Sequence, residues 1–282
     1  MKSRASIAAQ VREDYLSDLL LTGSTRGFVN ELDRRFDRLY QESVDRYYKA
    51  PPWDLPGVQL AICCYFAWGH ARTVDTFTRQ AMKLGFDWPR LHLLLSRQIY
   101  EEMVHHQLFR QAAIKLGGID PIHVRQPAAI KAICKAYDFA HGSSDILEKM
   151  YYSQFCSERA EIPAFKRLKE SMQTSRRGLD SLFEQALDQV QRDKPGHVGV
   201  GRMAAWELAD RGEAQRVRMI DLALDSISTT IDIWVTEVKN IPEIVTWAGS
   251  LVAAKAAAML HLTEADETNR DSLESWRVET PP

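Results

Sequence analysis

Residues 91–116 read LHLLLSRQIYEEMVHHQLFRQAAIKL, and their apolar positions recur at alternating spacings of four and three. This spacing places them on one face of an α-helix, so the stretch predicts an amphipathic helix packed against a core. Two members of the stripe, Glu102 and His105, are ionisable. A buried carboxylate is costly unless it is paired, hydrogen-bonded or bound to a metal, so we expect other helices to bring partners here. The stripe comprises Leu91, Leu95, Gln98, Glu102, His105, Phe109, Ala112 and Leu116.

The composition is that of an ordinary soluble protein, with 45% hydrophobic residues, 26% charged residues and a net charge of −2. No basic cluster interleaved with aromatics occurs, so we expect no nucleic-acid partner. The N-terminal apolar run is broken by charges, and the run over 251–262 contains Lys255 and is too short to span a bilayer, so we expect no membrane association. Four cysteines without a CxxC pair fit a reduced, cytoplasmic compartment.

The rest of the chain also has the period of helices, with prolines and glycines clustered between them and no sustained strand-like alternation. The sequence therefore predicts an all-α, single-domain helical bundle. We expect N-terminal helices over 1–50, a helical core over 51–240, and a C-terminal helix with a polar, poorly ordered tail over 241–282. The core helices are expected over 58–84, 91–116, 127–140, 146–169, 173–192 and 203–238, with DKPGHVGVG (193–201) as a loop and Pro242 as a break.

Two further helices place carboxylates in apolar stripes. Glu158 lies in the stripe of 146–169, where Pro163 is expected to kink the helix, and Asp210 and Glu213 lie in the stripe of 203–238. Helical bundles bind paired iron or manganese through inward carboxylates and E-x-x-H pairs, and these ligand types suit those metals. The pattern therefore favours a metal site formed by Glu102, His105, Glu158, Asp210 and Glu213.

Two other interpretations remain open at this point. The carboxylates could pair with arginines in a metal-free core or an anion pocket, and Glu101 with His106 offers a neighbouring face of the same helix. His70 shares a face with apolar residues of 58–84, where a lone histidine is more often a core residue than a ligand. The candidate arginines are Arg72, Arg97, Arg202, Arg211 and Arg216.

Three segments give the chain a resemblance to a known family. They are EEMVHHQLFRQAAIKLGG (101–118), YDFAHGSSDILEKMYY (137–152) and YYSQFCSERAEIPAF (151–165). From about 58 to 165 the chain resembles the haem-oxygenase-like oxidases, whose fold is shared with TenA thiaminases and pyrroloquinoline-quinone synthase. The nearest likeness is to the iron enzymes that decarboxylate a fatty acid to a terminal alkene. The resemblance implies that Glu102, His105 and Glu158 bind metal.

The last metal-binding helix departs from the family pattern. Members of this family offer an aspartate followed four positions later by a histidine. In WELADRGEAQRV (206–217), Asp210 stands for the aspartate, but Ala214 occupies the histidine position. Glu213 or Gln215 would have to substitute.

The first functional hypothesis is an oxygenase or oxidase of specialised, natural-product metabolism. It would bind one or two Fe(II) ions, with Mn(II) as an alternative, and use O₂ on a small carboxylate- or amine-bearing molecule. We expect His70, Tyr65, Phe66 and Tyr151 to wall the substrate pocket. The alternative is a metal-free member of the fold, either a cofactor-independent enzyme or a binding protein. A ferritin-like iron protein is a weaker third option, because a second E-x-x-H and an inward glutamate in the helix over 58–84 are both missing. A homodimer is compatible with the sequence.

Overall fold

The computed structural model describes residues 9–16, 19, 23–48, 50–51, 53–54, 57–118, 120–123, 126–128, 143–175 and 178–274. The side chains of 236–241, and most of those from 251 onward, lie outside the description. All elements within these ranges are helical and none is a strand, so the all-α prediction is confirmed. No helix of the described chain is long and apolar enough to cross a membrane.

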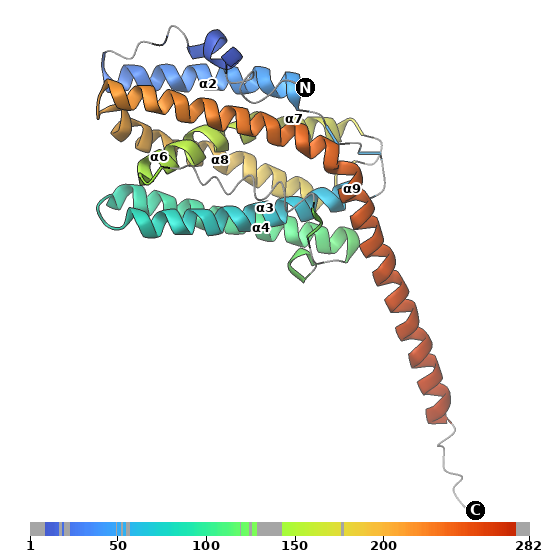
Figure 1. The fold of residues 1–282 in the computed structure, drawn as a ribbon. Coiled ribbons are helices and arrows are strands. Elements are labelled where there is room, and N and C mark those ends of the chain that lie inside the picture. Colours follow the sequence, from blue (N-terminus) through green and yellow to red (C-terminus); the bar gives the residue numbers. More distant parts are fainter. Residues whose placement is uncertain are drawn as a thin grey trace, which may run out of the picture.

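The long helices lie side by side in a bundle, and the C-terminal part of the last helix extends away from it (Figure 1). Helices α3 and α4 form the most extensive contact, and α8 packs on α4, on α7 and on the segment before α7. The helix expected over 127–140 lies almost entirely outside the described residues. The elements are η1 (Arg12–Leu16), α2 (Thr25–Tyr47), α3 (Val58–Leu84), α4 (Pro89–Gly117), η2 (Pro121–His123), α6 (Ile146–Met150), η3 (Tyr151–Ser157), α7 (Glu158–Gln173), α8 (Ser181–Ala209) and α9 (Glu213–Glu274).

Local sequence accounts for several helix ends. The carboxylate of Asp145 accepts a hydrogen bond from the Leu147 amide at 2.8 Å, and Asp180 accepts one from the Leu182 amide at 2.9 Å, which caps α6 and α8. Helix α4 begins at Pro89 and ends before Gly118, whose φ of 61° lies in the left-handed region that favours glycine.

The loop expected over 193–201 is wrong, because these residues lie inside α8. An interior proline costs a helix about 3 kcal/mol and each glycine about 1 kcal/mol, so tertiary packing must offset Pro195 and its neighbouring glycines. Gly201 shows one source of that packing. A Cβ at Gly201 would lie 2.2 Å from the backbone nitrogen of Phe155, so α8 approaches η3 more closely than any side chain would permit. Pro242 likewise lies inside a continuous α9 and does not break it.

The single helix expected over 203–238 is also wrong. The chain turns at 210–212, where Gly212 has a φ of 109°, and α9 begins at Glu213. Two residues that a continuous helix over 203–238 would place in its buried stripe, Trp206 and Val217, are 39% and 41% exposed. The stripe predicted over 203–238 is therefore wrong, because its residues belong to two helices, the end of α8 and the start of α9.

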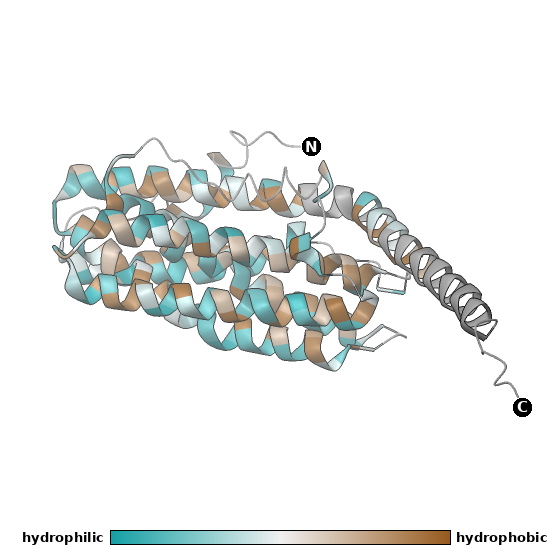
Figure 2. Ribbon diagram, turned by 90° about the horizontal axis from the view of Figure 1, so that it is seen from below, coloured by the Kyte–Doolittle hydropathy of each residue, from teal (hydrophilic) through white to brown (hydrophobic). Residues whose placement is uncertain are grey.

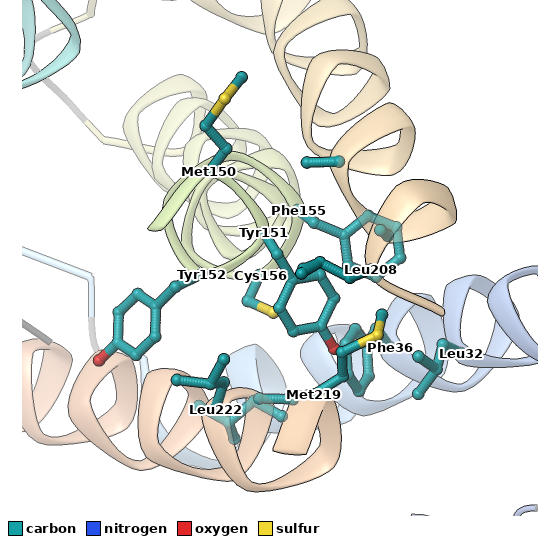
Figure 3. Close-up of a cluster of buried hydrophobic side chains, with 14 of the residues drawn as sticks. Leu32, Phe36, Met150, Tyr151, Tyr152, Phe155, Cys156, Leu208, Met219 and Leu222 are labelled. Carbon is teal, nitrogen blue, oxygen red and sulfur yellow. The ribbon is translucent and has the colours of Figure 1, made fainter. Parts of the chain in front are cut away.

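The helix expected over 146–169 contains a π-helical run, η3, immediately before Glu158. Its side chains fill the core between α2, α8 and α9 (Figure 3). Tyr151, expected in the pocket wall, is fully buried there instead and stacks on Phe155 with ring centroids 5.3 Å apart. Pro163 lies within α7, so the irregularity that immediately precedes Glu158 is the wider π-turn. Such turns are frequent at functional sites.

Apolar and polar residues interleave along the helices of the bundle (Figure 2). The buried apolar residues form two clusters, one containing Phe77 of α3 and Leu95 of α4, the other containing Ala61 of α3 and Phe109 of α4. Each long helix of the α3–α4 pair therefore runs from one cluster to the other. Between the clusters, α3, α4 and α8 bury polar side chains, among them His70, Glu102 and Lys194, so a polar layer crosses the middle of the bundle.

Candidate metal centre

The polar layer takes its side chains from four helices. Helix α3 contributes His70, α4 contributes Glu102 and His105, α7 begins with Glu158, and α8 contributes Lys194 and His197. Each of these residues is at most 5% exposed, and Glu102 and His105 are completely buried. Charged side chains reach such burial only when they are paired or bind a metal.

Glu102 lies at the centre of the layer and uses both carboxylate oxygens. Its Oε2 lies 2.6 Å from Nδ1 of His70 and 3.5 Å from Nδ1 of His105. Its Oε1 lies 3.1 Å from Nζ of Lys194 and 3.1 Å from Nδ1 of His197. The two oxygens of one carboxylate therefore face two different sets of partners.

Glu158 completes the second set. Its Oε2 lies 2.6 Å from Nζ of Lys194 and 3.0 Å from Nδ1 of His197. The layer thus contains two groups of potential metal ligands that share Glu102, and within each group the ligand atoms lie within 4.8 Å of one another. We call them the α3–α4 triad (His70, Glu102 and His105) and the α7–α8 triad (Glu102, Glu158 and His197).

Two of the histidines are held from outside by further carboxylates. Nε2 of His105 lies 2.9 Å from Oδ2 of Asp193, and Nε2 of His197 lies 3.1 Å from Oε2 of Glu101. Each ring therefore keeps Nδ1 turned toward Glu102. Nδ1 of His105 is buried and makes no hydrogen bond within the described chain. Metal-bound histidines have this arrangement, in which a carboxylate on the outer nitrogen fixes the ring.

Lys194 and the neighbouring histidines keep the central carboxyl groups ionised. Burial is the largest influence on the pKa of Glu102 and acts to raise it, but Lys194 and His70, followed by the other two histidines, hold the pKa well below its usual value. Burial and the charge of Glu102 oppose ionisation of Glu158, yet Lys194 and His197 lower its pKa as well. Burial acts to lower the pKa of Lys194, and the surrounding carboxylates raise it well above its usual value.

The two triads differ in the protonation of their histidines. Burial lowers the pKa of His70 to about 4, despite the opposing effect of Glu102, so this ring is neutral at neutral pH. Burial also acts to lower the pKa of His197, but hydrogen bonds to Glu101, Glu102 and Glu158 raise it to about 11. A neutral ring nitrogen is ready to bind a metal, whereas a protonated one must first lose its proton.

Carboxyl groups outnumber cations in and around the layer. Five carboxyl groups contact it, while the cations inside it are Lys194 and protonated His197, and Arg97 pairs with Glu101 from the surface. Burial raises the pKa of Glu161 to about 7, so this carboxyl group is only partly ionised at neutral pH. A buried excess of negative charge favours the uptake of a cation. The five carboxyl groups in contact with the layer are those of Glu101, Glu102, Glu158, Glu161 and Asp193.

The structure brings together three of the five predicted metal ligands, Glu102, His105 and Glu158. It does not bring Asp210 and Glu213 to them. Both are exposed at the turn between α8 and α9, and Asp210 accepts a hydrogen bond from the Thr25 hydroxyl at 2.9 Å. Assigning them to an inward stripe was wrong because the helix ends between them.

Sequence reasoning missed Asp193, Lys194 and His197, because they were assigned to a loop. The signal that identifies them is the spacing of Asp193 and His197, an aspartate followed four positions later by a histidine. The interpretation above assigned this spacing to Asp210, where Ala214 stands in place of the histidine. The cation that pairs with Glu102 and Glu158 is Lys194, which was not among the arginines considered.

A largely apolar pocket adjoins the layer. Its wall includes Tyr65, Phe66 and His70, as expected from the sequence, and Glu161. The cavity has a volume of about 60 Å³, which is well below the range of about 300–1,000 Å³ for small-molecule sites, so a substrate would have to widen it. His70 and Glu161 thus border both the pocket and the polar layer. The remaining lining residues are Tyr48, Gly69, Thr73, Ala164, Phe165, Leu168 and Trp234.

The sequence matches no protein-family model and no curated protein. The assignment of function therefore depends on the geometry of the layer and the pocket.

Proposed function

We propose that this protein is a non-haem metal-dependent oxygenase or oxidase of the haem-oxygenase-like type, with two metal positions that share Glu102. Fe(II) is the proposed metal, and Mn(II) suits the same ligands. The co-substrate is O₂, and the substrate is a small molecule bound in the pocket that His70 and Glu161 border.

The observation that carries this proposal is the orientation of the histidines. His105 and His197 each turn Nδ1 toward Glu102 while an outer carboxylate holds Nε2. A purely structural ion-pair network gives no reason to leave Nδ1 of His105 buried without a hydrogen bond in the described chain. The set of two histidines and one carboxylate in the α3–α4 triad is that of non-haem Fe(II) oxygenases, and bundles bind paired iron through similar sets.

The residues of the chain have separable roles in this proposal. When bound, iron supplies the electrons and the open coordination positions that O₂ chemistry requires. The aromatic wall excludes water from the substrate, and Asp193 and Glu101 orient the histidine rings. Glu161 holds or releases a proton at its carboxyl group, because its pKa of about 7 is matched to neutral pH.

Anaerobic loading with Fe(II), followed by elemental analysis and measurement of O₂ consumption, tests the proposal. The wild-type protein should retain at least one Fe(II) per chain and consume O₂ when air is admitted. Glu102→Gln should lose both properties, because both triads need this carboxylate. Glu170→Gln, which changes an exposed glutamate of α7, should behave as the wild type. Failure of the wild-type protein to retain metal would reject the proposal.

One observation favours a second candidate, a metal-free function. The Lys194 ammonium lies within 3.1 Å of Glu102, Glu158 and Glu161, so these carboxyl groups have a counter-ion from the chain itself. In that case the pocket would support acid–base chemistry by Glu161 or simple ligand binding, and metal retention would be absent in the same experiment.

A further inference from the structure

Lys194 contacts the same carboxylate atoms that the α7–α8 triad offers to a metal. Its Nζ lies 3.1 Å from Oε1 of Glu102 and 2.6 Å from Oε2 of Glu158. Nδ1 of His197 lies 3.1 Å and 3.0 Å from the same two oxygen atoms. An ion bound by this triad would therefore need the oxygens that the ammonium already uses.

The α3–α4 triad has no such competitor. Glu102 faces His70 and His105 through its other oxygen, Oε2, whereas the shortest contact of Lys194 with this carboxylate is to Oε1. A cation bound there would contact atoms that Lys194 does not engage. The two metal positions therefore differ in how closely the Lys194 ammonium contacts their carboxylate oxygens.

Lys194 also has a further partner at the edge of the layer. Its third contact is Oε2 of Glu161, at 2.6 Å, and Glu161 borders the pocket with a side chain that is 24% exposed. The flexible four-carbon stem of a lysine lets its ammonium move from the inner carboxylates toward Glu161 while α8 stays in place. Release from Glu102 and Glu158 would thus leave the ammonium paired with Glu161.

We propose that Lys194 is a built-in competitor for the second metal position, so that the α3–α4 triad binds an ion first and the α7–α8 triad binds one only when the ammonium is displaced. This inference rests on the proposed metal centre and adds an order of loading to it. The chain then has a state in which one metal ion and one ammonium neutralise the layer, and a state in which two metal ions do so.

Titration with Mn(II), followed by calorimetry and elemental analysis, tests this order in the wild-type protein and in Lys194→Met, which removes the charge and keeps the length of the stem. In the wild type the second equivalent should bind much more weakly than the first. In Lys194→Met it should bind at least about tenfold more tightly than in the wild type, with the first equivalent little changed. Before Mn(II) is added, the variant should also have a lower melting temperature, because three carboxyl groups lose their counter-ion.

Lys169→Met is the matched control, because Lys169 also joins α7 to α8 by pairing with Glu184 and Asp188, but away from the polar layer. It should leave both Mn(II) equivalents unchanged. If Lys194→Met does not fold, Lys194→Gln keeps a hydrogen-bond donor for the carboxylates and replaces it in the titration.

Unchanged or weaker binding of the second equivalent on removal of the Lys194 charge would overturn the inference while leaving the metal centre intact. Absence of Mn(II) binding in the wild-type protein and in every variant would instead reject the metal centre itself, and the inference with it.

Discussion

The two triads share Glu102 and lie side by side in one buried layer, yet they are built differently. The α3–α4 triad lies on two helices joined by a short turn, its His70 is neutral, and it uses Oε2 of Glu102, whereas Lys194 is closest to Oε1. The position of the α7–α8 triad depends on the π-helical run η3, on the close contact of Gly201 with η3, and on helix α8 staying intact around Pro195. This triad also faces Lys194. In the proposed metal centre, this difference makes the α3–α4 triad the preformed metal position and the α7–α8 triad the conditional one.

Substitution of the histidines should separate the two positions and gives the largest expected effect. His197→Gln removes a ligand of the α7–α8 triad only, so the protein should still retain about one Mn(II) per chain at the α3–α4 triad. His105→Gln removes the preformed position and should leave only weak binding. Elemental analysis after dialysis measures the Mn(II) retained per chain in both variants.

His92→Gln is the control for this pair, because His92 lies on the same helix as His105 but stacks on the exposed Phe86. It should retain metal as the wild type does. Equal losses in His105→Gln and His197→Gln would contradict the division into a preformed and a conditional position.

Gly201→Ala should weaken metal binding at the conditional position indirectly, by changing the packing of α8. The added methyl group would meet the backbone of Gln154 and Phe155, so α8 must move away from η3, and we expect a loss of about 1–3 kcal/mol in the free energy of unfolding. The shift would also separate His197 from Glu158, so the second Mn(II) equivalent should weaken more than the first.

Gly199→Ala adds the same methyl group to the same helix at a position where, apart from its chain neighbours and the backbone of α8 itself, no atom lies within 4 Å. It should stabilise α8 by up to about 1 kcal/mol through helix propensity. Chemical denaturation of both variants gives the comparison, and similar changes in both would show that the contact of α8 with η3 has no special role.

The pH dependence of binding should differ between the positions and gives the smallest effect. His197, with a pKa of about 11, is protonated at neutral pH before an ion binds, so the second equivalent must release its proton. Its affinity should rise by about tenfold for each pH unit between about pH 6 and 9. His70, with a pKa of about 4, has no proton to release in this range. Proton release measured by calorimetry in buffers of different ionisation enthalpy should therefore be greater for the second equivalent, and equal release would contradict the assignment.

The helix over 91–116 could be predicted from sequence because its stripe has one period throughout. All of its members are buried except Leu116, which is 36% exposed at the end of the helix. Glu102, His105 and Glu158 were found for the same reason, since each interrupts an otherwise apolar stripe.

The second half of the layer could not be predicted in this way. Pro195, Gly196 and Gly199 give 193–201 the composition of a loop, and only contacts with distant residues keep it helical. The spacing of Asp193 and His197 was visible in the sequence, but nothing local showed that both side chains face the core.

The most direct test of a two-position centre is a crystal structure of the protein saturated with Mn(II), with the ions located by anomalous scattering. We predict two peaks in the polar layer, one contacting His70, Glu102 and His105 and the other contacting Glu102, Glu158 and His197, with Lys194 moved away from the inner carboxylates. A layer without peaks, and with Lys194 still paired to Glu102 and Glu158, would contradict the account.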